Sequence, residues 1–140
     1  MLWLLIGGLF MCTFASTAAH ACSCAFSDET YSASELENEG VVILRGHAVT
    51  RTHSIVGFVY QFEVEQVLVG AVPDRVNIFA GRGGGDCGFE IPLGETRTLV
   101  ARVSDSRVLQ ATKSEYSVDI CSQSLRNRVR GVSYWLKKNI

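Results

Sequence analysis

Two cysteines separated by one residue, in Cys22-Ser23-Cys24, form the part of the sequence with the most distinctive chemistry. They follow an uncharged apolar run over 2–14 and a stretch of small residues that ends in Ala19-His20-Ala21. This ending matches the A-x-A pattern of a signal peptidase site. We therefore predict that residues 1–21 are a signal peptide and that the mature protein begins at Cys22. Cleavage there would create an α-amine beside two sulfur atoms.

The mature chain would keep four cysteines, Cys22, Cys24, Cys87 and Cys121, because Cys12 leaves with the signal peptide. An even number of cysteines in an exported protein predicts disulfides, here two. A four-cysteine zinc site is the rival interpretation, but such sites pair two close-spaced motifs, whereas Cys87 and Cys121 stand alone. A Cys22–Cys24 bridge would close a strained small ring, so we expect each of these two to join a distant partner. The spacing leaves the pairing open.

Two membrane-linked alternatives concern the same N-terminal segment. The apolar run over 2–14 is shorter than the roughly 20 residues that a membrane-spanning helix needs. Lipidation of Cys22 would use its sulfur and, with N-acylation, its amine. The preceding Ala19-His20-Ala21 fits a lipidation motif poorly, since His20 is large. A membrane partner is therefore expected only if Cys22 is lipidated.

Length and charge narrow the class of protein. Removing 21 of the 140 residues leaves 119, which is enough for one domain with a modest core. The formal net charge of −1 gives no electrostatic basis for binding nucleic acid or another polyanion. We expect an exported protein, secreted or periplasmic, that is a monomer of one domain over 22–140.

Hydrophobic patterning predicts five short strands between two helical segments. The strands are expected over 41–49, 57–69, 76–80, 96–103 and 107–111, the last two forming a hairpin around 104–106. An acidic helix is expected over 28–39, with Ser27 or Asp28 as its N-cap and Gly40 at its end. A basic helix is expected from Ser122, with Leu125, Val129, Val132 and Leu136 on one face. We expect surface pairing between the two helices.

Strand edges must be covered, and closure into a small barrel does this. The expected fold class is therefore all-β, a five-stranded, OB-like closed barrel with flanking short helices. In the strand over 57–69, Phe58, Tyr60 and Phe62 are expected on the core face. Glu63 and Glu65 are expected on a wetter face. The three aromatics could bind a sugar if exposed, but their alternation favours a core role.

Other chemistry-bearing residues give weak signals. The loop Gly81–Gly88 lacks the Gly-Lys-Ser/Thr ending of a phosphate loop, so we interpret it as a connection that leads to Cys87. His47 and His53 have no carboxylate or cysteine at ligand spacing, so each is expected to be a surface histidine or one whose hydrogen bonds are satisfied within the protein. No motif orders serine, histidine and aspartate as a catalytic triad. We predict no enzymatic activity, no cofactor and no metal site of its own.

Several pieces of the sequence resemble the N-terminal domain of the tissue inhibitors of metalloproteinases, which is a netrin-like, OB-type domain. The pieces are Cys22-Ser23-Cys24, the segment over 41–49, the segment over 60–67 with Gly70, and Cys87-Gly88 followed by Leu93-Gly94 and Thr98-Leu99-Val100-Ala101. The resemblance implies the pairings Cys22–Cys87 and Cys24–Cys121. The family's third disulfide in this domain and its C-terminal domain have no counterpart, so the chain is similar to a minimal, bacterial-type relative.

The resemblance also implies a function, namely the inhibition of zinc metalloproteases. The α-amine and carbonyl of Cys22 would chelate the zinc of the target protease, and Ser23 would enter its specificity pocket. If Cys87 joins Cys22, Arg82 and Asp86 become rim contacts with the partner. The alternative is an extracellular interaction module, without a protease target, in which the Cys-x-Cys pattern only staples the fold.

Overall fold

The computed structural model describes Cys22, Cys24 and residues 29–83 and 86–130. Several expectations lie outside the described residues: the signal peptide, Ser23, a helix cap at Ser27 or Asp28, and the positions of Val132 and Leu136.

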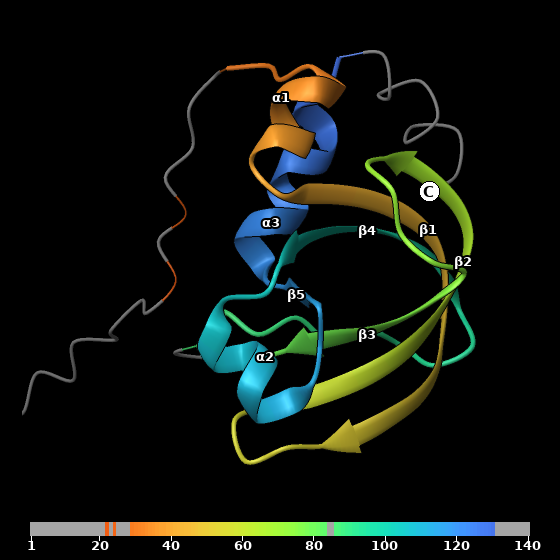
Figure 1. Ribbon diagram of the computed structural model, residues 1–140, viewed down its shortest axis with the longest axis vertical. Coiled ribbons are helices and arrows are strands. Elements are labelled where there is room, and N and C mark those ends of the chain that lie inside the picture. Colours follow the sequence, from red (N-terminus) through yellow and green to blue (C-terminus); the bar gives the residue numbers. More distant parts are fainter. Residues whose placement is uncertain (1–21, 23, 25–28, 84–85, 131–140) are drawn as a thin grey trace, which may run out of the picture.

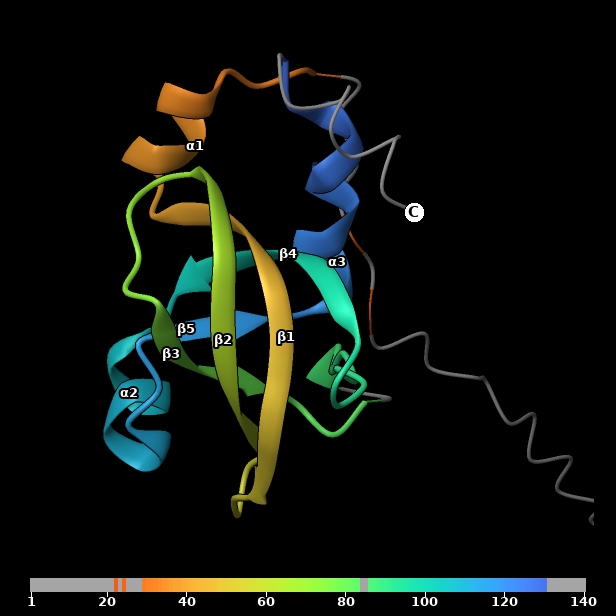
Figure 2. The same cartoon turned by 90° about the vertical axis from the view of Figure 1, so that its right-hand side faces the viewer.

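Five strands form a closed barrel, which confirms the predicted fold class (Figures 1 and 2). The strands are β1 (Val41–His53), β2 (Phe58–Val69), β3 (Arg75–Ala80), β4 (Thr96–Val103) and β5 (Tyr116–Val118). Their order around the barrel is β1-β2-β3-β5-β4, with β4 returning to β1. The pairing of β3 with β5 is parallel and the others are antiparallel. Closure leaves none of these five strands at an open sheet edge.

Alternating side chains of the strands fill the barrel. On β2, Tyr60 and Phe62 are fully buried, and Phe58 packs partly buried against the same cluster, which confirms their predicted core role. The interior also contains Val42, Leu44, Ala48, Val76, Ile78, Ala80, Ile91, Leu99, Ala101 and Val118. A sugar therefore cannot reach Tyr60 or Phe62.

A second apolar layer lies outside the barrel, under helix α1 (Ala33–Asn38). There Val41 and Ile43 of β1 pack with Leu36 of α1 and with Val129. The start of β1 is thus buried on both faces, which explains its continuous apolar run. Ser32 caps α1 in a capping box with Glu35, so the helix starts later than predicted.

Three register shifts interrupt the pairing of β1 with β2, and two of them constrain particular residues of β1. Between Arg45 and Gly46 the strands approach so closely that a Cβ on Gly46 would lie 1.9 Å from the Glu63 carbonyl oxygen. A second shift between Ala48 and Thr50 leaves Val49 as an extra residue. Such a bulge reverses the alternation beyond it.

The segment over 107–111 is helical, so the predicted hairpin is wrong. Helix α2 spans Ser106–Thr112, and the Asp105 carboxylate accepts hydrogen bonds from the backbone N–H groups of Arg107 and Val108, each at 2.9 Å. Asp105 is therefore a helix N-cap and not a hairpin turn residue. The fifth strand, β5, follows α2.

The prediction of one continuous basic helix from Ser122 is also wrong in its extent. Helix α3 covers Ile120–Ser124, a 3₁₀ turn covers Leu125–Arg128, and Val129 is extended. The backbone near Val129 pairs with Tyr31 instead, whose N–H donates to Arg128 at 2.9 Å. This pairing buries Val129 against Leu36 without a helix.

The acidic and basic segments, which were predicted to pair at the surface, are joined by an exposed ion pair. The Arg130 guanidinium lies 3.6 Å from the Glu35 carboxylate. Hydrogen bonds from the backbone and hydroxyl of Ser32, with Arg130 nearby, lower the pKa of Glu35. A pair this exposed contributes little to stability.

We predict that Gly46→Ala destabilises the barrel by about 3 kcal/mol or more, because its Cβ would collide with the β2 backbone. Gly94→Ala is the control. Gly94 has a φ of 74° but open space around its Cβ position, so its replacement should cost only about 1 kcal/mol. Urea denaturation measures both, and equal losses would contradict the collision.

Candidate functional site

Two disulfides attach the N-terminal cysteines to the barrel. Cys22 is bonded to Cys87 and Cys24 to Cys121, with Cα–Cα distances of 5.4 Å and 5.3 Å. The pairings implied by the family resemblance are thus confirmed, and the four-cysteine zinc site is wrong because every sulfur concerned is in a disulfide. A lipidated Cys22 could not form its bridge.

The two bridges converge on one place in the fold. The backbone N–H of Ile120 donates a hydrogen bond to the Cys87 carbonyl at 3.0 Å. Since Ile120 directly precedes Cys121, this bond ties the two barrel-side cysteines to each other. Cys22 and Cys24 are therefore both bonded to the same region of the barrel.

Helix α3, which carries Cys121, is held against β4 by side chains. The Gln123 amide donates to the Val100 carbonyl at 2.8 Å and accepts from the Val100 N–H at 3.2 Å. The buried Ser122 hydroxyl also donates to the Val100 carbonyl, at 3.0 Å. Asp119 completes a capping box with Ser122. These contacts fix the position of Cys121 and hence of Cys24.

The loop that carries Cys87 is organised by Asp86. Its carboxylate accepts hydrogen bonds from the backbone N–H groups of Arg82, Gly83 and Gly88, at 2.7 to 3.0 Å. Partial desolvation opposes ionisation of this exposed carboxyl, but the backbone hydrogen bonds together outweigh it and lower the pKa of Asp86. The ionised Asp86 carboxylate thus holds the backbone of this loop together through three hydrogen bonds.

The same loop needs glycine where the chain approaches itself. A Cβ on Gly81 would lie 2.7 Å from the Asp86 carboxylate, and one on Gly88 would lie 2.1 Å from the Gly83 nitrogen. Cys87 itself has a φ of 56°, a left-handed conformation that is uncommon outside glycine. Its disulfide and its hydrogen bond to Ile120 hold it there. The glycine-rich composition therefore serves the geometry of Cys87.

The Arg82 side chain makes hydrogen bonds within the protein. Its guanidinium donates to the carbonyls of Ser54 and Ile55, at 3.1 and 3.0 Å, and so supports the turn between β1 and β2. Both Arg82 and Asp86 are exposed. The prediction that both residues contact a partner at its rim stays a prediction. Their hydrogen bonds within the protein were not predicted, because Arg82 contacts residues that are distant in sequence.

A cross-strand cluster surrounds His47, which the sequence spacing did not reveal. His47 lies opposite Glu63, and its ring nitrogens lie 3.5 Å from the Glu63 carboxylate and 3.1 Å from that of Glu65. Arg75 pairs with Glu63 from the next strand. His53 instead packs against the edge of Phe58, with ring centroids 4.8 Å apart. Within the described residues, no group of three or more His, Cys, Asp or Glu side chains could hold a metal ion.

Comparison with protein-family models, with curated proteins and with solved structures gives no match for this chain. Over the described part of the chain, no helix is long and apolar enough to cross a membrane. The fold and the site together define a five-stranded barrel whose Cys-x-Cys segment is held by two converging disulfides.

We predict that Gln123→Ala destabilises the fold by about 1–2 kcal/mol, because it removes two hydrogen bonds from the Val100 backbone. Gln110→Ala is the matched control, since Gln110 is exposed on α2. Thermal unfolding of the disulfide-bonded proteins measures the difference. Equal midpoints for the two variants would show that Gln123 does not hold α3.

We also predict that Asp86→Asn changes the pH dependence of stability. The folded-state pKa of Asp86 lies below its ordinary value of 3.8, so its ionised form favours the folded state at neutral pH. This contribution is lost as the pH falls through the folded-state pKa. The variant should be less stable at pH 7 and lose less stability on acidification. Urea unfolding at pH 7 and at about pH 3 tests both expectations, and parallel pH profiles would contradict them.

Proposed function

We propose that the mature protein inhibits zinc metalloproteases through its N-terminus. The α-amine nitrogen and carbonyl oxygen of Cys22 bind the catalytic zinc of the target enzyme, and Ser23 enters the adjoining specificity pocket. The proposal requires export and cleavage before Cys22, and the two disulfides are in keeping with an oxidising compartment.

The observation that carries the proposal is the convergence of the two bridges. Cys22 and Cys24 are each bonded to a cysteine of the barrel, and those two cysteines are tied by the Ile120–Cys87 hydrogen bond. A terminus fixed in this way loses little conformational entropy when it docks. A clamp on the first and third residues of a mature chain suits a ligand that must hold one geometry at a metal.

The chemistry of the terminus fits an open zinc coordination site. A catalytic zinc is held by three protein ligands, with water in the remaining position. An α-amine and the carbonyl of the same residue form a five-membered chelate ring that displaces this water. The α-amine has an ordinary pKa of about 7.7–8.0, and zinc binds its deprotonated form. Inhibition should therefore weaken as the pH falls below neutral.

The barrel around this terminus offers a stable platform. The Asp86 loop holds Cys87, and Gln123 and Ser122 hold the helix that carries Cys121. The contacts that position Cys87 and those that position Cys121 come from two different parts of the chain. The terminus is supported from both sides by residues that do not need to touch the protease.

The test is an inhibition titration against a panel of zinc metalloproteases. Oxidised protein that begins at Cys22 is compared with a version that carries one additional Ala before it. The extension converts the α-amine to an amide and leaves both disulfides possible, so we expect inhibition to fall by at least about a hundredfold. Circular dichroism and thiol titration confirm that both proteins are folded and oxidised.

Equal inhibition by the two proteins would contradict the amino-terminal chelate and place the interface elsewhere. Absence of inhibition by either protein would favour the alternative, an interaction module in which the disulfides only staple the fold. A serine protease serves as the negative control, because it has no catalytic zinc for the Cys22 amine and carbonyl to bind.

A further inference from the structure

The turn between β1 and β2, residues 54–57, carries two exposed apolar side chains in succession; we call this turn the hairpin tip. Ile55 is 88% exposed, the highest value for a large apolar residue in the described part of the chain, and Val56 is 44% exposed. Neither residue belongs to the two apolar clusters that form the core. A single exposed apolar side chain is ordinary, whereas an adjacent pair at a turn suggests a contact with something outside the protein.

The hairpin tip is held in place by contacts behind it. The Ser54 N–H donates to the Gly57 carbonyl at 2.8 Å, and the Gly57 N–H donates back to the Ser54 carbonyl at 3.4 Å. Gly57 lies directly against β3, since a Cβ at this position would be 2.4 Å from the Ala80 carbonyl oxygen. The turn therefore presents Ile55 and Val56 without needing their side chains for its own packing.

Two carbonyl groups of the hairpin tip already have a partner within the protein. The Arg82 guanidinium donates hydrogen bonds to the carbonyls of Ser54 and Ile55, at 3.1 and 3.0 Å. A carbonyl that lost its water without such a donor would oppose entry of the tip into an apolar medium. Arg82 lowers this cost at the residue whose side chain is most exposed. The tip is thus suited to leave water.

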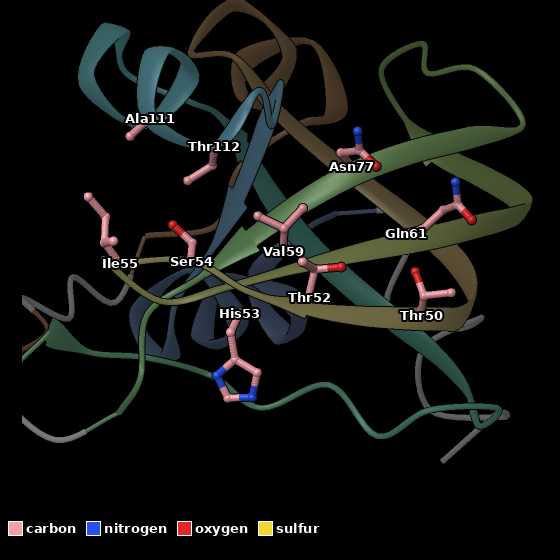
Figure 3. A pocket seen from close by; sticks show the side chains of 10 residues that line it. All are labelled: Thr50, Thr52, His53, Ser54, Ile55, Val59, Gln61, Asn77, Ala111 and Thr112. Atoms are coloured by element: carbon pink, nitrogen blue, oxygen red, sulfur yellow. The ribbon is translucent and has the colours of Figure 1, made fainter.

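The charges near the hairpin tip favour an anionic surface. Among the described residues, no carboxylate lies within ion-pair distance of the Arg82 guanidinium, whereas the neighbouring Arg51 is paired with Glu90 at 2.9 Å. The hollow of about 610 Å³ beside the tip is lined by no Asp or Glu. Figure 3 shows Ile55 on the same side of this hollow as Ala111 of α2. A negatively charged surface therefore meets no carboxylate of the hollow on this side of the tip.

The hairpin tip also has the right place in the fold. It lies with α2 at one end of the barrel, and α1 lies at the other end (Figures 1 and 2). In both views the tip is the part of the barrel that projects furthest at its end. A flat surface that approaches this end would meet the tip before the strands.

We propose that the hairpin tip inserts Ile55 and Val56 into the interface of an anionic phospholipid membrane, with Arg82 near the lipid phosphates. Apolar side chains gain free energy at the boundary between headgroups and acyl chains, and a cation beside an anionic bilayer adds to it. Two side chains and one cation give a reversible contact. This contact requires no lipid on Cys22 and adds a membrane partner that the sequence did not predict.

A partner protein is the less favoured occupant of the hairpin tip, because the apolar surface is small. A specific protein interface buries about 1,200–2,000 Å² in total, which two side chains do not supply. A bilayer sets no such minimum, since its lipids rearrange around an inserted side chain and the gain scales with the apolar area that is buried.

The test uses the oxidised protein that begins at Cys22 and vesicles of phosphatidylcholine mixed with phosphatidylglycerol. Sedimentation at millimolar lipid measures binding, and Ile55→Ser should weaken it by about tenfold, because the larger inserted side chain is lost. Leu93→Ser is the matched control, since Leu93 is 51% exposed but lies outside the tip, beside Ala48. A spin label on the acyl chain should broaden the NMR amide signals of Ile55 and Val56 more than that of Leu93.

Vesicles of phosphatidylcholine alone should bind more weakly, because they lack the anionic lipid that attracts Arg82. Five results would overturn the proposal: no binding at millimolar lipid, equal binding to both kinds of vesicle, equal effects of Ile55→Ser and Leu93→Ser, binding that salt abolishes and Ile55→Ser leaves unchanged, and a dimer that Ile55→Ser dissociates without any vesicle binding. The Ala-extended protein should bind the vesicles normally, so failure of this proposal and failure of the protease proposal are separable.

Discussion

The rest of this structure depends on the closure of the barrel between β4 and β5, where only two residue pairs join the strands. Strand β5 pairs with β4 at Arg102 with Ser117 and at Val103 with Tyr116, and then the chain turns into α3. The next backbone groups of β4, at Val100, are satisfied by the side chains of Ser122 and Gln123. Unpaired buried backbone groups are costly, so α3 must stay in place for the barrel to close.

The closure also determines where the N-terminus lies. Helix α3 carries Cys121, and its first N–H is bonded to the Cys87 carbonyl at the end of the Asp86 loop. Two segments more than 30 residues apart in sequence are thereby joined, and each offers one cysteine to the N-terminal pair. The disulfides then add cross-links over long loops, where the entropic gain is greatest. The fold and the candidate site therefore share one set of contacts.

The strands were predictable because their side-chain alternation is set by burial on one face, as Tyr60 and Phe62 show. The helix α2 was missed because Asp105 suits a turn and an N-cap equally well, and only its bonds to Arg107 and Val108 distinguish them. The end of the last helix depends on pairing with Tyr31, almost a hundred residues away. The change in side-chain alternation along β1 depends on a bulge at Val49 that one sequence does not reveal. The disulfide pairing came from family resemblance, since two of the three possible pairings remained after a Cys22–Cys24 bridge was excluded.

The most direct test of this account is non-reducing peptide mapping by mass spectrometry of the full chain after export from a bacterial host. The account predicts an unmodified amine on Cys22 as the first residue, with Cys22–Cys87 and Cys24–Cys121 as the disulfides. A retained leader or an acylated Cys22 would contradict it, because each removes the free α-amine on which the proposed inhibition rests. The crossed pairing of Cys22 with Cys121 would contradict the arrangement of the two disulfides.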